Sequence, residues 1–209
     1  MAVRIRTLFD TPAHMRMTAE QYIDNPLSEQ KSDLIEGVFV MASPASFIHE
    51  ELQVYLTTIL SLYVDTKRLG KVLGPNTAYR LSEDNVFQPD ISFIRAERLH
   101  LAADVYFPGP PDLAVEIISP SSRQYDEVEK RINYGRFGTQ EYWLLDPMDE
   151  TVRFLGLVDD QLLPIPPEEG VHRSRVLPGF WLRTEWIFPP KDQARPTVME
   201  VAGCLGLLK

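Results

Sequence analysis

The stretch LAVEIISPSSRQYDEVEKRINYGRFGTQEYWLL, residues 113–145, contains the pattern that decides the fold. Its first part, Leu113 to Ile118, is an almost continuous apolar run, which is typical of a strand covered on both faces. A helical pattern follows from Arg123 to Phe137, and Tyr142 to Leu145 is again apolar. A buried strand, a helix and a second buried strand in this order predict an α/β fold.

The residues before this stretch predict a further helix and several short strands. We expect one strand from Leu34 to Met41, then a long amphipathic helix that opens at Ser43-Pro44 and is closed by Gly70. Strand-like segments follow at Lys71–Leu73, Thr77–Leu81 and Ile91–Ile94. The predicted core order is therefore αβββαβ, in a mixed β-sheet flanked by helices.

The residues after the stretch predict extra antiparallel strands at one edge of the sheet, around Val152–Leu157 and Arg173–Val176. Neither an internal repeat nor a linker is visible in the sequence. We therefore expect a single domain over residues 1–209, in which 1–30 is an N-terminal lead-in and 190–209 is a C-terminal tail.

The composition is that of an ordinary globular protein, with 209 residues, 44% hydrophobic and 24% charged. No stretch approaches the roughly 18 apolar residues of a membrane helix, and residues 1–10 lack the apolar segment of a secretion signal. The single cysteine, Cys204, excludes an internal disulfide and a cysteine-based zinc site. We therefore expect a soluble cytoplasmic protein with no membrane partner.

The formal net charge of -9 argues against tight nonspecific binding to nucleic acid, because phosphate-binding proteins usually carry a basic surface. The charge is unevenly distributed along the chain. Eight acidic residues and one basic residue lie between Glu141 and Glu169, whereas four basic and three acidic residues lie between Arg123 and Arg136. Nucleic acid therefore stays open as a partner.

Three residues carry the chemical interest: Asp90 after Pro89, Glu116 in the apolar run, and Lys130 in the helix that follows. An ionised carboxylate in a buried strand costs on the order of several kcal/mol unless a cation compensates it. A second carboxylate from a neighbouring strand and a lysine from the helix would together form an oxygen-lined site suited to Mg²⁺ and phosphate. This combination indicates a metal-dependent nuclease.

Each of these residues also has a purely structural interpretation. Lys130 can form an i, i+4 ion pair with Asp126. Asp90 can belong to a turn at a strand entrance, and Glu116 can form a salt bridge with an arginine. The residues alone leave both interpretations open.

The segments QPDISFI (residues 88–94) and PPDLAVEIISPSSRQYDEVEKRINYGRFGTQEYWLLDP (residues 110–147) closely resemble the Uma-type endonuclease family. The resemblance includes SDLIEGVFVMASPASFIHEEL (residues 32–52) and VLPGFWL (residues 176–182), and extends from about Met17 to Trp186. That family belongs to the PD-(D/E)XK nuclease superfamily, so the resemblance implies a restriction-endonuclease-like fold.

In that superfamily a proline-preceded aspartate, an acidic residue in the next strand and a lysine share one metal-dependent phosphodiesterase site. The resemblance therefore gives the acidic roles to Asp90 and Glu116. The superfamily lysine normally stands two residues after the glutamate, where this chain has Ile118. The family pattern D-x-x-x-K-x-x-x-Y places it instead on the next helix, as Lys130, with Tyr134 as an accessory residue.

The resemblance also implies an acidic residue near the first strand and a histidine at the start of the first long helix. The acidic residue would be Asp33 or Glu36, and the family more often has glutamate where this chain has Asp33. The histidine would be His49, although a lone histidine there is more often a core or capping residue than a ligand. The choice between the two acids stays open.

The activity implied by the resemblance is hydrolysis of a phosphodiester by a metal-activated water. Asp90, Glu116 and the backbone carbonyl of Ile117 would hold Mg²⁺ or Mn²⁺, and Lys130 would orient the water or stabilise the developing charge. The partner would be nucleic acid, in the first place DNA, and cutting of both strands would favour a homodimer. Two alternatives stay open: an inactive nuclease-fold module that binds DNA or protein, and a plain α/β interaction protein with a salt bridge at Glu116.

Overall fold

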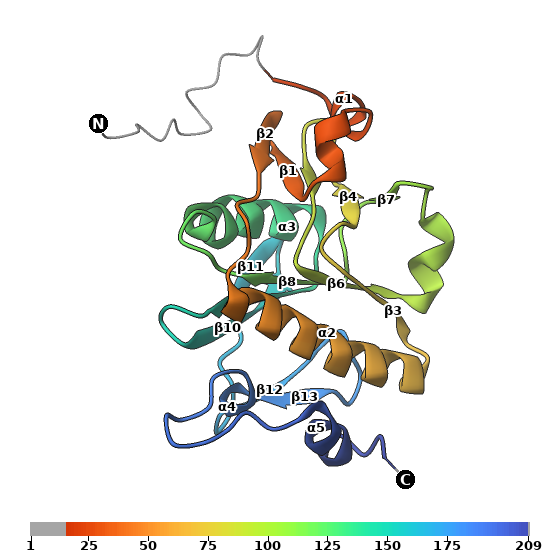
Figure 1. Cartoon of the computed structure of the whole chain (residues 1–209). Coiled ribbons are helices and arrows are strands. Elements are labelled where there is room, and N and C mark those ends of the chain that lie inside the picture. Colours follow the sequence, from red (N-terminus) through yellow and green to blue (C-terminus); the bar gives the residue numbers. More distant parts are fainter. Residues whose placement is uncertain (1–15, 209) are drawn as a thin grey trace, which may run out of the picture.

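The computed structural model describes residues 16–208 of the chain (Figure 1). Its helices and helical turns are, in chain order, α1 (Ala19–Ile23), η3 (Pro26–Glu29), α2 (Phe47–Lys67), η4 (Ala96–Leu101), η5 (Tyr125–Lys130), α3 (Arg131–Phe137), α4 (Thr184–Ile187) and α5 (Val198–Cys204). The first half of the predicted lead-in, residues 1–15, and residue 209 of the predicted tail lie outside the described residues. Over residues 16–208, no helix has both the length and the apolar character needed to cross a membrane.

The strands of the described residues form three sheets. The six-stranded sheet has the order β11 (Gln161–Pro164), β10 (Thr151–Val158), β9 (Glu141–Asp146), β8 (Leu113–Ile117), β6 (Ile91–Arg95), β3 (Gly70–Leu73). The five-stranded sheet has the order β2 (Val38–Met41), β1 (Ser32–Ile35), β5 (Val86–Phe87), β4 (Ala78–Arg80), β7 (Tyr106–Pro108). The two-stranded sheet pairs β12 (Val171–Arg173) with β13 (Trp181–Arg183).

The elements α2, β3, β6, β8, α3 and β9 occur in this order along the chain, and their strands all belong to the six-stranded sheet, although β4, β5 and β7 lie between them in sequence and belong to another sheet. Strand β6 runs antiparallel to β8, and β8 runs parallel to β9. A parallel pair needs a crossover connection, which η5 and α3 supply. Both β8 and β9 are buried along their whole length, as their apolar runs predict. The predicted mixed α/β architecture is confirmed.

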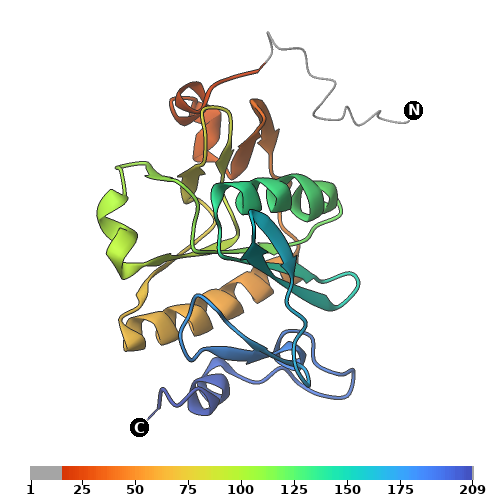
Figure 2. The same cartoon turned by 180° about the vertical axis from the view of Figure 1, so that it is seen from behind.

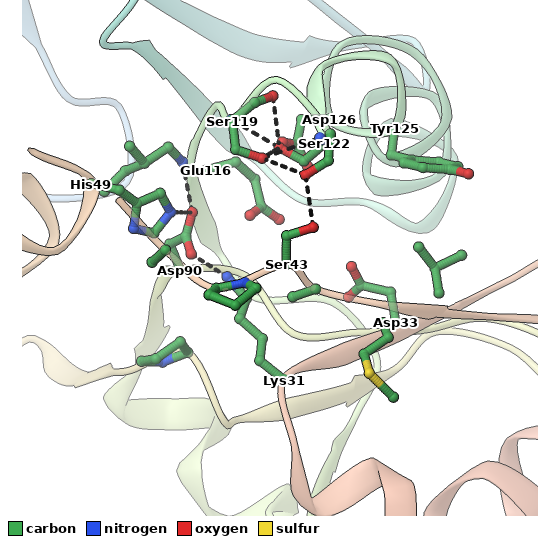
Figure 3. Close-up of a pocket in the computed structure, with 18 of the residues that line it drawn as sticks. Lys31, Asp33, Ser43, His49, Asp90, Glu116, Ser119, Ser122, Tyr125 and Asp126 are labelled. Carbon is green, nitrogen blue, oxygen red and sulfur yellow. Dashed lines mark hydrogen bonds and ion pairs between the residues drawn. The ribbon is translucent and has the colours of Figure 1, made fainter. Parts of the chain in front are cut away.

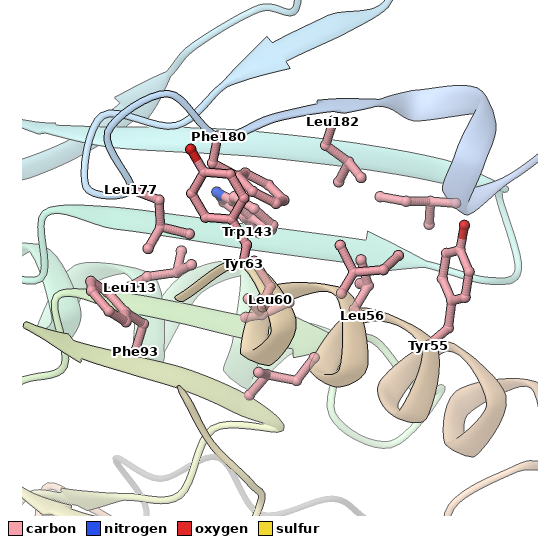
Figure 4. Close-up of a cluster of buried hydrophobic side chains, with 14 of the residues drawn as sticks. Tyr55, Leu56, Leu60, Tyr63, Phe93, Leu113, Trp143, Leu177, Phe180 and Leu182 are labelled. Atoms are coloured by element: carbon pink, nitrogen blue, oxygen red, sulfur yellow. The ribbon is translucent and has the colours of Figure 1, made fainter. Parts of the chain in front are cut away.

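The two faces of the six-stranded sheet carry separate hydrophobic clusters, since successive side chains of a strand point to opposite faces. Val115 and Ile117 of β8 pack in the cluster beneath α2, whereas Ala114 and Ile118 pack in the cluster beneath α3. Figures 1 and 2 show α2 and α3 on opposite sides of the sheet, and Figure 4 shows the cluster beneath α2. Glu116 therefore faces α3, the helix that follows its own strand.

The segment predicted as one strand from Leu34 to Met41 is a hairpin, so this prediction was wrong. Strands β1 and β2 pair antiparallel, and Glu36 and Gly37 form the turn between them with φ of 51° and 77°. Positive φ at both positions is the turn geometry that suits the twist of a two-residue hairpin, and glycine adopts it at little cost. Apolar residues on both sides of the turn hid it in the sequence.

Helix α2 begins and ends at other residues than predicted. Ser46 caps its N-terminus and accepts a hydrogen bond from the backbone N–H of His49 at 3.3 Å, and Arg68 ends it with φ of 55°. Gly70, predicted to close the helix, is the first residue of β3 instead. A methyl group at Gly70 would lie 1.9 Å from the carbonyl oxygen of Ile94. This glycine is therefore needed for the close approach of β3 to β6.

Two predicted strands lie outside the six-stranded sheet. The segment Thr77–Leu81 contains β4, which pairs with β5 and, in parallel, with β7 in the five-stranded sheet. The segment at Arg173 belongs to β12, which pairs with β13, so only Val152–Leu157, within β10, extends the sheet edge as predicted. In the predicted tail, Val201 and Leu205 pack into the cluster beneath α2, so these two side chains belong to the hydrophobic core.

Candidate active site

Asp90 and Glu116 lie beside each other on neighbouring strands. Ile91 of β6 is paired with Val115 of β8, so extending this antiparallel register by one residue places Asp90 next to Glu116. Both residues are buried, with 2% of each exposed. Asp90 Oδ2 accepts a hydrogen bond from the backbone N–H of Ile117 at 2.7 Å, which fixes the carboxylate against the neighbouring strand. The structure thus brings together the two acids that the sequence singled out.

Two further groups hold the carboxylate of Asp90. Lys31 Nζ, from the segment just before β1, forms an ion pair with Oδ1, and His49 Nε2 lies 3.3 Å from Oδ2 (Figure 3). His49 stands in the first turn of α2, so the start of this helix directs the imidazole toward the entrance of β6. Burial alone would raise the pKa of Asp90, but Lys31 and His49 outweigh it and hold this pKa below the usual range. Asp90 is therefore an ionised carboxylate.

Lys130 is the last residue of η5, a π-helical turn at the N-terminal side of α3. Its ammonium lies 2.9 Å from Glu116 Oε1, 2.8 Å from Asp33 Oδ2 and 3.3 Å from Asp126 Oδ1. The predicted pair with Asp126 and the predicted contact with Glu116 thus coexist, and the cation beside Glu116 is a lysine rather than an arginine. π-Helical turns within α-helices are frequent at functional sites.

A third acidic group comes from β1. Asp33 Oδ1 accepts a hydrogen bond from the backbone N–H of Gln88 at 2.7 Å, while its Oδ2 faces Lys130. Gln88 Oε1 accepts in turn from the backbone N–H of Ser32 at 3.2 Å, so the hairpin is tied to the residues before β6. Of the two acids that the sequence left open, Asp33 lies at the site. Glu36 lies in the hairpin turn at the far end of β1.

The electrostatic environment of Glu116 differs from that of Asp90. Burial raises the pKa of Glu116 well above its usual value, and the carboxylates of Asp126 and Asp90 add to the rise, although Lys130 opposes it. Burial likewise raises the pKa of Asp126. Both acids therefore hold protons more tightly than usual, chiefly because they are buried.

The formal charges of the site do not cancel. Four buried carboxylates face two ammonium groups, which leaves a charge of -2 when all are ionised. The groups belong to Asp33, Asp90, Glu116, Asp126, Lys31 and Lys130. Buried charge is costly unless it is compensated, and hard oxygen donors in this number fit a divalent cation such as Mg²⁺ or Mn²⁺.

The carboxylates do not form a complete set of metal ligands while Lys31 and Lys130 are paired with them. Among residues 16–208, no three histidine, cysteine or acidic side chains are gathered as ready ligands of one metal ion. Asp90 Oδ1 faces Lys31, and Glu116 Oε1 faces Lys130. The donor chemistry therefore fits a divalent cation, provided that the cation replaces an ammonium group at one of the carboxylates.

These groups line a cavity of about 540 Å³ between the β1–β2 hairpin, the start of α2 and the loop after β8. Serine hydroxyls stand at its wall: Ser43 and Ser121 lie 3.1 Å apart, and Ser119 and Ser122 lie 3.0 Å apart (Figure 3). Ile117, which the resemblance implied as a backbone ligand, also lines the cavity. The cavity therefore combines carboxylates, ammonium groups and hydroxyl donors.

Tyr134 does not line the cavity, although its phenol lies close enough to Glu116 and Lys130 for their charges to affect its pKa. It is fully buried, with its ring edge-on to Phe87 at 5.2 Å between centroids and 5.2 Å from the ring of Tyr142. Burial raises the pKa of its phenol well above the usual value. Its position fits a packing role beneath α3, one turn away from Lys130.

The sequence interpretation did not include Lys31. The signal available for it was indirect, because the buried acids Asp90 and Glu116 require more cationic charge than Lys130 supplies. Lys31 lies in an irregular segment, and no spacing rule connects it with Asp90, 59 residues away. Its role therefore emerges only from the fold.

The sequence also did not reveal a separate cluster of buried polar groups around Glu141. At the start of β9, Glu141 accepts hydrogen bonds from Trp143 Nε1 at 2.7 Å, Ser174 Oγ at 2.9 Å and the backbone N–H of Arg175 at 2.8 Å. His172 Nε2 of β12 lies 2.6 Å from its Oε1. This cluster lies outside the cavity and ties the two-stranded sheet to the six-stranded sheet.

Residues 19–185 match the Uma2 family, described as "Putative restriction endonuclease". A protein of Synechocystis sp., described as "Uncharacterized protein sll1609", is 24% identical over 150 residues, which cover 69% of this chain and 83% of that protein. A crystal structure from Anabaena variabilis, described as "a putative nuclease belonging to DUF820", is similar with a TM-score of 0.71 and 21% identity, covering 82% of this chain and 97% of that one.

At 21% identity the solved structure shows the fold, which agrees with the mixed α/β architecture described above. The family match spans most of the chain and includes every side chain of the acidic site. The family suggested by the sequence motifs is thereby confirmed. This chain belongs to the Uma2 family.

Proposed function

We propose that the protein is a metal-dependent endonuclease that hydrolyses phosphodiester bonds of DNA, with Mg²⁺ or Mn²⁺ as cofactor. The observation that carries the proposal is the surplus of carboxylate charge at one cavity, where Asp90 pairs with Lys31 and Glu116 pairs with Lys130. In this proposal the six-stranded sheet with α2 and α3 is a restriction-endonuclease-like core. The whole chain, residues 1–209, forms one domain around it.

The residues of the site have separate roles in the proposed reaction. Asp90, Glu116 and the backbone carbonyl of Ile117 would hold the cation, which would supply a Lewis acid for the phosphodiester and for the attacking water. Lys130 keeps Glu116 in place and supplies positive charge near the phosphate, where negative charge develops in the transition state. His49 orients Asp90.

The two remaining acids, Asp33 and Asp126, have an indirect role, because they position Lys130. Asp33 and Asp126 hold its ammonium from two other elements, β1 and η5, and they therefore position it against Glu116. Cutting of both DNA strands requires two such sites, so the proposal includes a homodimer.

A second candidate function rests on the ion pairs themselves. Lys31 and Lys130 already neutralise part of the acidic cluster, and the net charge of -9 disfavours tight binding to DNA. These two observations favour a nuclease-fold protein without catalysis, which binds nucleic acid or a protein partner.

Nicking of supercoiled plasmid by the purified full-length protein separates the two functions. The endonuclease should convert plasmid to nicked and linear forms with Mg²⁺ or Mn²⁺ and should stop when EDTA is added. Asp90→Asn and Glu116→Gln should each lower the rate by about 100-fold or more, since each weakens the hold on the cation.

The matched control is Asp65→Asn, which removes one carboxylate from the exposed end of α2, where the Asp65 side chain is 66% exposed. This variant should nick at the wild-type rate. Thermal unfolding establishes that all variants are folded. Equal behaviour of the wild type and the two site variants would assign any nicking to contamination and leave the binding module as the function.

A further inference from the structure

Lys31 differs from Lys130 in how firmly it is held. Lys31 belongs to the irregular segment between η3 and β1 and lines the cavity, and its side chain is 26% exposed, against 4% for Lys130. In the part of the chain that the structure describes, it pairs with one carboxylate, that of Asp90. A lysine ammonium on a flexible four-carbon stem can leave such a position with little rearrangement of the backbone.

Lys130 is held far more strongly. Asp33, Glu116 and Asp126 surround its ammonium, and each comes from a different element of the fold. Removing this ammonium would leave three buried carboxylates without their cation, which is strongly unfavourable. Releasing Lys31 would instead free one oxygen of Asp90 at the cavity wall. Of the two lysines, Lys31 is therefore the one that an incoming cation can displace.

The geometry of Asp90 shows where such a cation would bind. Its Oδ2 accepts the hydrogen bond from Ile117 and faces His49, so this oxygen is already occupied on the protein side. Its Oδ1 faces Lys31. A divalent cation on Oδ1 would meet the ammonium at close range, and two positive charges at one carboxylate oxygen repel each other strongly.

We propose that Lys31 is an exchangeable counter-ion of the site: it neutralises Asp90 in the metal-free protein, and a divalent cation bound by Asp90 and Glu116 displaces its ammonium into the cavity to bind the phosphodiester. This inference rests on the proposed function, since the cation and the phosphodiester are those of that reaction. It makes Lys31 a substrate-binding residue and leaves Lys130 as the fixed ammonium of the site.

Amine labelling of the wild-type, full-length protein tests the displacement without any substitution. Acetylation followed by mass spectrometry reports the reactivity of each lysine with EDTA and with saturating Mn²⁺. Lys31 should become several-fold more reactive with Mn²⁺, because its ammonium leaves a carboxylate and enters solvent. Lys130 should stay unreactive, and Lys71, whose side chain is 58% exposed, should not change. Equal reactivity of Lys31 in both conditions would overturn the exchange.

Mn²⁺ binding, measured by electron paramagnetic resonance of the free ion, tests whether Lys31 and Mn²⁺ compete for the carboxylate of Asp90. Lys31→Gln removes the competing charge and should tighten binding about tenfold, the size of effect that a neighbouring like charge has on an ionic equilibrium. Lys31→Arg keeps the charge and should bind Mn²⁺ like the wild type, as should the control Lys71→Gln. Equal or weaker binding by a folded Lys31→Gln variant would overturn the proposal.

Nicking of plasmid at saturating Mn²⁺ tests whether the displaced ammonium of Lys31 binds the phosphodiester. Lys31→Gln should nick plasmid about tenfold more slowly or worse although it binds Mn²⁺ more tightly, because the phosphodiester has lost an ammonium. A wild-type rate would overturn the substrate-binding role. Exchange of Lys31 without any nicking by the wild type would reject the endonuclease and keep the exchange. Nicking without exchange would reject the exchange and keep the endonuclease.

Discussion

The ammonium of Lys130 lies 2.8 Å from Asp33 Oδ2, and this contact joins the π-helical turn on the six-stranded sheet to β1 of the five-stranded sheet. Lys130 is therefore both a residue of the candidate site and a link between two sheets. Its loss should affect stability as well as activity, and the two effects can be measured separately.

Replacing Lys130 by methionine keeps the length of the side chain and removes its charge. Asp33, Glu116 and Asp126 would then be buried without their ammonium, and we expect a loss of about 3 to 5 kcal/mol in the free energy of unfolding. Urea denaturation measures it, with Lys71→Met as the surface control, for which about 0.5 kcal/mol or less is expected. A loss for Lys130→Met as small as that of the control would show that the carboxylates do not depend on this cation.

Moving the lysine to the strand tests whether only the position of the ammonium matters. Ile118 lies two residues after Glu116 and packs on the same face of the sheet, so a lysine there points toward α3. The double variant Ile118→Lys/Lys130→Met should nick plasmid faster than Lys130→Met alone, although lost apolar packing will lower its stability. Rates no better than those of the single variant would show that the helix position itself is required.

Glu141 makes the stability of the protein depend on pH. Burial alone would raise its pKa, but His172, Trp143 and Ser174 outweigh burial and lower it. A carboxylate with a lowered pKa stabilises the fold above its unfolded-state pKa, here about 4.5, and this stabilisation is lost as the pH falls through the folded-state pKa.

The variant Glu141→Gln should therefore be less stable than the wild type at pH 7, by about 1 to 3 kcal/mol, because it loses charge-assisted hydrogen bonds. The difference should shrink once the pH falls below about 4.5. Chemical unfolding of both proteins across this range measures it. A gap that is independent of pH would mean that the charge of Glu141 contributes nothing to stability.

Mn²⁺ should stabilise the folded protein, because binding to the native state alone favours that state. At 100 times the Kd we expect about 2.7 kcal/mol of added stability, seen as a raised melting temperature, and none in the Glu116→Gln variant at the same concentration. A flat response of the wild type at millimolar Mn²⁺ would instead support a plain α/β interaction protein in which ion pairs complete the site.

The core of the site was predictable because it follows from local rules. The alternation of β8 places Glu116 on the face covered by the next helix. Lys130 reaches Glu116 from that helix, although it stands in a π-helical turn that the α-helical spacing did not predict. Asp90 at the entrance of the adjacent strand completes the arrangement. These three positions require only knowledge of which strands are neighbours.

The other groups at the site depend on contacts between distant segments. The choice between Asp33 and Glu36 could not be made while the β1–β2 hairpin was taken for one strand. Lys31 reaches Asp90 from an irregular segment, and Glu141 meets His172 31 residues later. No periodicity of the sequence encodes such contacts.

The fold likewise has elements that the sequence predicts and elements that it does not. Strands β8 and β9 and their crossover helix are encoded by continuous apolar runs and helical spacing, and they were found where expected. The five-stranded sheet was not foreseen, because its pairings of β1 with β5 and of β4 with β7 are non-local. Short strands of two to four residues carry too little pattern to predict their partners.

A crystal structure of the full-length protein soaked with Mn²⁺ would show whether Asp90 and Glu116 hold a divalent cation. Anomalous scattering should place one Mn²⁺ within about 2.0 to 2.6 Å of a carboxylate oxygen from each of the two residues. The ammonium of Lys31 should have left Asp90, while Lys130 should still contact Asp33. A Mn²⁺-soaked crystal with no anomalous peak between the two acids, and with Lys31 still paired to Asp90, would rule out the proposed cation site.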